Sequence, residues 1–169
     1  MYFYVSKLIN DDFKLMKRVL ILIYVLMSSV ALHAETPVQE LIAQYEDVKG
    51  IRILVAKGAM MSVVRPMLKS YTIAPMADYV EELSALRIGR GIDADEKEKF
   101  LTALSEALKS YMYVGKTKST SGVVDAYVHL LSDEVVDELV VFNPKTKALN
   151  TLLGEFPVSE LETLKNEDF

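Results

Sequence analysis

Apolar and polar residues alternate along the chain from residue 122 to residue 157. This period of two is typical of β-strands with one buried face. Short polar turns at residues 132–134 and 143–147 separate three such segments, and strands joined by turns this short must run antiparallel. The pattern therefore predicts a three-stranded antiparallel meander at the C-terminal end. In its first strand one side carries Val124, Ala126, Val128 and Leu130, and the other carries Asp125, Tyr127, His129 and Leu131.

Helical spacing replaces the alternation in several earlier segments. Thr36 and Pro37 are suited to the N-cap and the first position of a helix, and apolar residues recur behind them up to Val48. Asp93 opens a second helix whose first turn is acidic and whose apolar stripe begins at Phe100. A third helix is predicted from Ala59, where Met60, Met61, Val64, Met67 and Leu68 fall on one side and Pro66 kinks or ends it. A short helix closes the chain after Pro157.

The remaining segments complete an α+β pattern. Residues 51–57 have the aliphatic density of a buried strand, residues 75–82 form a weakly helical turn, and residues 83–88 and 111–117 predict two further strands. We therefore expect one α+β domain over residues 35–169, built on an antiparallel sheet that ends in the meander, with helices packed on one face.

The first 34 residues predict a secretory signal peptide. Lys17 and Arg18 precede an apolar run at residues 19–31, which is too short for a comfortable membrane span, and small residues follow it. Cleavage is expected after Ala34, with Ala31 as the alternative. Met16 is a more natural initiator than Met1, so residues 1–15 read as an over-extended start. The alternative is that the segment stays on the protein as an N-terminal anchor.

Composition removes several chemistries from consideration. The 169 residues include no cysteine, which excludes disulfides, thiolate catalysis, cysteine-bound metals and a lipid anchor at a lipobox cysteine. Residues 1–34 hold four of the 19 basic and two of the 24 acidic residues, so the remainder has 15 and 22 and a net charge of −7. An acidic chain without a basic run is a poor partner for nucleic acid. His129 is then the one remaining histidine, and no cofactor is expected.

Three groups of residues invite a ligand, and each has a plainer interpretation. The sulfurs of Met60, Met61, Met67 and Met76 are more typical of core packing than of a soft-metal site. Arg90 between Gly89 and Gly91 is more typical of a flexible turn than of an anion site. The acids Asp93, Asp95, Glu96 and Glu98 lack the glycine and spacing of a calcium loop, so helix capping accounts for them. We predict no catalytic, cofactor or metal residues.

Short motifs spread over residues 38–164 resemble a family of exported Gram-negative proteins, the domain of unknown function forty-two fifty-two and its relatives. They are a helix ending in Tyr45-Glu46, the Gly50-Ile51 strand followed by Lys57-Gly58 and Met60, the strand Leu86-Arg87-Ile88, an acidic helix, and Gly154-Glu155-Phe156 followed by Leu161. The resemblance implies an exported α+β domain and supplies no catalytic residues. Many relatives have a lipobox cysteine, which this chain lacks.

These observations leave three hypotheses for function. The first is a non-enzymatic periplasmic or secreted module that binds an envelope protein, using an edge strand of the C-terminal half, and that meets the membrane only during export. The second is a carboxylate-dependent hydrolase, for which the candidate groups are Asp125, Asp133, Glu134, Asp137 and Glu138, with His129. Those acids are expected at turn and solvent-facing positions, which disfavours catalysis. The third is an accessory of envelope signalling, which differs from the first only in its partner.

Overall fold

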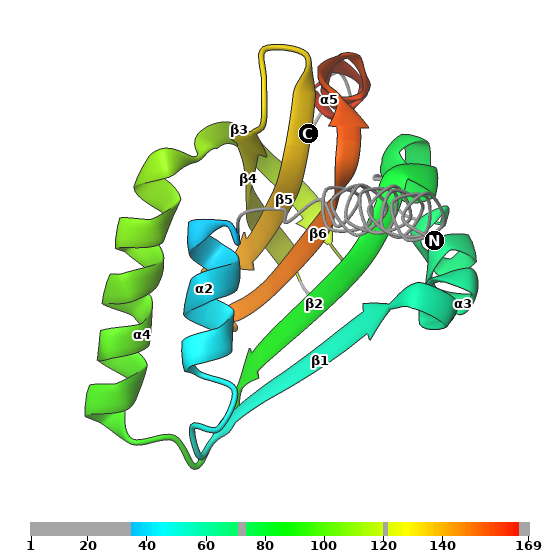
Figure 1. Cartoon of the computed structure of the whole chain (residues 1–169). Coiled ribbons are helices and arrows are strands. Elements are labelled where there is room, and N and C mark those ends of the chain that lie inside the picture. The colour runs from blue at the N-terminus through cyan, green and yellow to red at the C-terminus, as the bar shows by residue number, and fades with distance from the viewer. Residues whose placement is uncertain (1–34, 71–73, 120–121, 166–169) are drawn as a thin grey trace, which may run out of the picture. The chain divides into compact units, whose positions relative to one another are not determined.

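One six-stranded antiparallel sheet organises the domain in a computed structural model that describes residues 35–70, 74–119 and 122–165. The predicted signal peptide and its cleavage point after Ala34 lie outside the described residues. In the described part no helix is both long and apolar enough to cross a membrane. The strand order is β1-β2-β6-β5-β4-β3 (Figure 1). The strands are β1 (Ile51–Lys57), β2 (Val80–Ile88), β3 (Met112–Ser119), β4 (Gly122–Leu130), β5 (Val135–Asn143) and β6 (Ala148–Pro157).

The predicted meander is confirmed as β4, β5 and β6, which lie side by side in antiparallel register. Its turns follow local chemistry, since the Asn143 side chain accepts hydrogen bonds from the backbone N–H groups of Lys145 and Thr146 at 2.9 and 3.0 Å. The meander is not at the border of the sheet. β2 pairs with β6, which places Leu83 opposite Leu152, and β1 adds beyond β2.

Helices α2 (Pro37–Gln44) and α4 (Ala94–Ala107) begin where their caps predict. The Thr36 side chain accepts from the Gln39 N–H, and the Asp93 carboxylate accepts from the Asp95 N–H at 2.9 Å. Both helices pack on one face of the sheet. Their shared core with the strands comprises Val38, Leu41, Ile42, Ile51, Leu86, Phe100, Leu104, Tyr111, Val140 and Leu149.

A second core lies on the opposite face, because adjacent strand residues such as Leu139 and Val140 point to opposite sides. α3 (Met61–Leu68), the 3₁₀ segment η2 (Ala74–Tyr79) and α5 (Val158–Lys165) contribute to it. Helices therefore contribute to both faces of the sheet, and the prediction that they pack on one face is wrong, because the strands carry apolar side chains on both sides and each side needs a cover. The core on this side comprises Ala56, Met61, Leu68, Met76, Ala77, Val80, Val128, Val136, Leu139, Leu152, Phe156 and Leu161.

Two predictions about burial are wrong. Strand β1 is an edge strand, with only Ile51 and Ala56 buried, rather than a buried strand. In the short 3₁₀ segment η1 (Gly58–Met60) and in α3, Met60 and Met67 are exposed, whereas Met61 and Leu68 are buried. The cause is the helical period: residues one position apart are turned by about 100°, so Met60 and Met67 lie on a different face from Met61 and Leu68.

Candidate functional site

A buried polar cluster joins helix α2 to the middle of the sheet. Gln39 projects from the first turn of α2, where the Thr36 cap fixes the start of the helix. Its side-chain amide donates to Glu138 Oε1 at 2.7 Å and to Thr151 Oγ1 at 2.8 Å. Glu138 lies on β5 and Thr151 on β6, so one amide group connects the helix to two central strands.

Tyr111 forms a hydrogen bond with Glu138 from another direction. It stands between the 3₁₀ segment η3 (Leu108–Ser110) and β3, and its hydroxyl donates to Glu138 Oε2. The same hydroxyl accepts the Val38 N–H at 3.3 Å, which satisfies one of the free N–H groups in the first turn of α2. Both carboxylate oxygens of Glu138 therefore accept a hydrogen bond from a neutral group.

Burial controls the electrostatics of this cluster. Glu138 is 0% exposed, and no ion pair among the described residues includes it. Burial raises the pKa of Glu138 above its ordinary value, and the nearby Asp137 adds to the increase, while the bonds from Thr36, Tyr111 and Gln39 oppose it. Burial and the Glu138 carboxylate likewise raise the pKa of the Tyr111 hydroxyl.

A β-bulge brings Asp137 beside this cluster. The register of β5 against β6 shifts between Val136 and Glu138, and the register of β4 against β5 shifts between His129 and Leu130. Against β4 the extra residue is Asp137, whose Oδ1 lies 2.7 Å from Nδ1 of His129. Asp137 therefore contacts His129, and the next residue, Glu138, lies directly opposite His129 in the β4–β5 ladder.

The His129–Asp137 pair has a defined chemistry. When Asp137 is ionised and the ring is neutral, the contact requires the proton on Nδ1, which makes Nε2 the acceptor nitrogen. The His129 side chain is 26% exposed, and its ring lies 5.1 Å from the Tyr111 ring, measured between centroids. A histidine held in this tautomer can take a proton from a bound water or hydroxyl.

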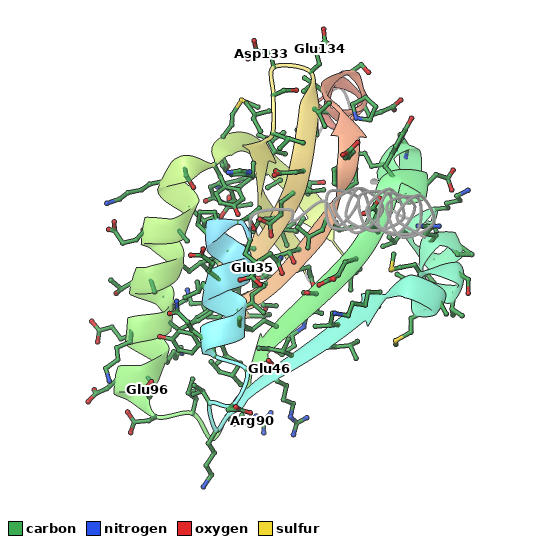
Figure 2. All side chains as sticks on the ribbon, viewed as in Figure 1. Glu35, Glu46, Arg90, Glu96, Asp133 and Glu134 are labelled. Atoms are coloured by element: carbon green, nitrogen blue, oxygen red, sulfur yellow. The ribbon has the colours of Figure 1, made fainter. Side chains whose placement is uncertain are left out.

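The expectation that all the acids lie at turn or solvent-facing positions is wrong for Asp137 and Glu138, which are both buried. The bulge and the covering helix α2 cause the difference. Asp133 and Glu134 do lie in the exposed β4–β5 turn, where Figure 2 shows them pointing away from the sheet. Asp125 is separate, because its carboxylate accepts from Tyr113 at 3.2 Å.

The other sequence candidates have local roles in the structure. Gly89 donates its N–H to the Gly50 carbonyl at 2.7 Å, so it closes the chain against β1 beside the exposed Arg90. Asp93 caps α4, and Glu96 pairs with Lys99 at 2.6 Å. Among the residues that the structure describes, no group of three or more His, Asp or Glu side chains is placed to hold a metal ion.

An exposed apolar surface lies outside the polar cluster. Five large apolar side chains on β1, η1 and α3 are exposed, and two of them, Leu54 and Val63, are 61% and 67% accessible. We call this set the β1–α3 apolar surface. Its members are Leu54, Val55, Met60, Val63 and Met67, of which Leu54 and Val55 are adjacent on β1 and point to opposite faces of the sheet. The sequence contains a sign of this surface, because apolar residues lie on more than one face of the α3 segment. We nevertheless assigned the methionines to the core.

Comparison with known protein families, with curated proteins and with solved structures finds no match for this chain. The site is therefore interpreted from its own residues.

Proposed function

We propose that the protein is an exported binding module of the cell envelope, periplasmic or secreted, that recognises a protein partner through the β1–α3 apolar surface. The observation that carries this proposal is the exposure of five large apolar side chains on consecutive elements of one edge of the sheet. Clustered exposed apolar groups on a small domain are typical of interaction sites. The export component rests on the basic and apolar pattern of residues 1–34 and on the family resemblance.

Burying the β1–α3 apolar surface against a partner has a favourable free energy. Complete burial of one exposed Leu, Val or Met side chain contributes about 1.5 to 3 kcal/mol. Three such side chains approach the roughly 8 kcal/mol of a micromolar complex before the costs of association are subtracted. This supports a moderate affinity, of the kind typical of accessory and sensor proteins.

Site-specific photo-crosslinking in growing cells tests the partner. A photoreactive residue at Val63 or Met67 is expected to give one dominant adduct of defined mass, because these side chains lie on the binding surface. The matched control is Lys97 or Glu98, which are also exposed and helical but lie on α4. The proposal fails if the α3 and α4 positions give the same adducts, or if none forms at α3.

Cell fractionation with intact-mass measurement tests the export component. We expect the mature protein outside the cytoplasm, starting at Glu35 after cleavage following Ala34, or at Leu32 after cleavage following Ala31. A retained anchor would leave residues 19–31 in the mass. An unprocessed product in the cytosol would contradict export.

A second candidate is a carboxylate-dependent hydrolase, favoured by the His129–Asp137 pair beside Glu138. Here His129 takes a proton from water, Asp137 orients the ring, and Glu138, whose pKa burial raises, is the candidate general acid. A panel of ester, phosphodiester and glycoside substrates tests it. Turnover by the wild type that is lost in Asp137→Asn, with folding retained, supports this candidate, and no turnover eliminates it.

A further inference from the structure

The two outer strands of the sheet differ in how well they are protected. Strand β3, at one border, carries a bulge between Tyr113 and Gly115, which is a device that discourages pairing with another chain. Strand β1, at the other border in Figure 1, pairs with β2 over all seven residues without a register shift. β1 is therefore the strand open to a further strand.

The phase of the β1 ladder identifies which backbone groups are open. The Gly50 carbonyl accepts from the Gly89 N–H, so alternate residues from Gly50 onward direct their N–H and C=O toward β2. Ile53 and Val55 direct theirs away from β2. The hydrogen bond from Ile51 N–H to the Val48 carbonyl at 3.0 Å, on the outer side, agrees with this phase. In the part of the chain that the structure describes, the outward groups of Ile53 and Val55 have no hydrogen-bond partner.

The positive charges of β1 determine which kind of strand can pair with its open edge. Arg52 lies directly opposite Arg87 in the β1–β2 ladder, an arrangement of like charges that is unfavourable. None of the ion pairs between described residues includes Arg52, Arg87 or Lys57. A second copy of β1 paired antiparallel about Leu54 would bring four positive charges, Arg52 and Lys57 from each copy, to one ladder. An acidic strand would instead neutralise them.

We propose that β1 binds an extended segment of the partner as a seventh strand, antiparallel, with acidic residues facing Arg52 and Lys57 and apolar residues facing Ile53, Leu54 and Val55. This inference rests on the proposed function and names the class of partner. The outward N–H and C=O groups of Ile53 and Val55 form the ladder, and the side chains select the sequence. Leu54 lies on the same face as Ala56, which belongs to the core that α3 shares, so the added strand runs beside the apolar side chains of α3.

A designed peptide tests the inference on the purified full-length protein. It has seven residues, blocked ends, glutamates facing Arg52 and Lys57, and valine or isoleucine facing Ile53, Leu54 and Val55. The control peptide has lysines in place of the glutamates. We expect the acidic peptide to bind more tightly, with amide chemical-shift changes at residues 51–57 and none on α4.

Two protein variants make the test specific. Val55→Pro removes an outward N–H but none of the β2 hydrogen bonds, so it is tolerated in an edge strand. Binding of the acidic peptide should weaken about fivefold to tenfold, the loss of one hydrogen bond. Arg52→Glu leaves one negative and one positive charge on β1, so it should abolish the preference for the acidic peptide over the lysine peptide, and it keeps the inference testable if Val55→Pro does not fold.

The results that overturn the inference are distinct from those that overturn the proposed function. Absent peptide binding, equal binding by wild type and Val55→Pro, or shifts away from β1 overturn strand addition. A dimer by sedimentation that Val55→Pro converts to monomer shows that a second copy occupies the edge and also overturns it. If crosslinks from Met67 persist in those cases, the binding function stands and only the mode of recognition is wrong.

Discussion

Replacing Tyr111 by Phe should destabilise the domain far more than the loss of one oxygen atom suggests. The hydroxyl donates to the buried carboxylate of Glu138 and accepts from the Val38 N–H. A hydrogen bond to a charged group contributes about 1.5 to 3 kcal/mol, and the neutral bond at the start of α2 adds about 0.5 to 1.5 kcal/mol. We expect the free energy of unfolding to fall by about 2 to 4 kcal/mol at neutral pH.

The effect should depend on pH, and the sign follows from linkage. The Tyr111 bond lowers the pKa of Glu138, so removing it raises that pKa further. The variant then binds the Glu138 proton more tightly than the wild type does, and the stability difference between them grows as pH rises. In acid, where Glu138 is neutral in both proteins, the difference should shrink to about 1 to 3 kcal/mol, the value of the two neutral hydrogen bonds that the hydroxyl then makes.

Urea unfolding followed by far-ultraviolet circular dichroism, from pH 4 to pH 8, measures these quantities. Tyr113→Phe is the matched control, because Tyr113 lies two residues further along the chain, on β3, and its hydroxyl bonds to Asp125 at an exposed site. That change should cost no more than about 0.5 kcal/mol. If Tyr111→Phe costs as little as the control, or costs the same at every pH, Glu138 does not depend on Tyr111 and the account of the cluster is wrong.

Three further changes probe other parts of the structure. Because the folded-state pKa of Glu138 is raised, the stability that Glu138 contributes is complete below the ordinary value of 4.5 and is lost as pH rises through the folded pKa. Glu138→Gln should therefore gain stability relative to wild type over that pH window, by at most about 1.4 kcal/mol per pH unit. Parallel pH profiles of urea unfolding for the two proteins would refute this. Gly154→Ala places a Cβ 2.0 Å from the carbonyl oxygen at the end of η2, so it should lower the stability measured by thermal unfolding by about 1 to 3 kcal/mol. In the control Gly91→Ala the added Cβ meets no atom within 4 Å, so stability should hardly change. Equal melting temperatures for the two variants would contradict the close approach at Gly154. Asp93→Ala removes the cap of α4 and should lower the free energy of unfolding by about 1 kcal/mol. Glu98→Ala, at an exposed position of the same helix, should change it little. A larger loss of stability for Glu98→Ala than for Asp93→Ala would reject capping as the role of Asp93.

The polar cluster could be predicted from the sequence only in part. The alternation along β4 places His129 correctly on the side opposite Val128, and the candidate hydrolase residues already included Asp137 and Glu138. Their burial could not be predicted, because the acids follow an acidic turn and resemble its solvent-facing continuation. The bulge at Asp137 turns this segment inward, and α2, nearly a hundred residues earlier in sequence, supplies Gln39 to cover it.

Local structure could be predicted from residue type alone: the caps of α2 and α4, the period-two strands of the meander and the turns between them. These features depend on residues within a few positions of one another, whose hydrogen bonds and rotations are set by residue type. The insertion of β2 beside β6, the position of β1 at the open edge and the enclosure of Glu138 could be seen only in the folded domain. Those outcomes depend on packing between segments far apart in the chain, where many arrangements bury similar apolar area and no local pattern distinguishes between them.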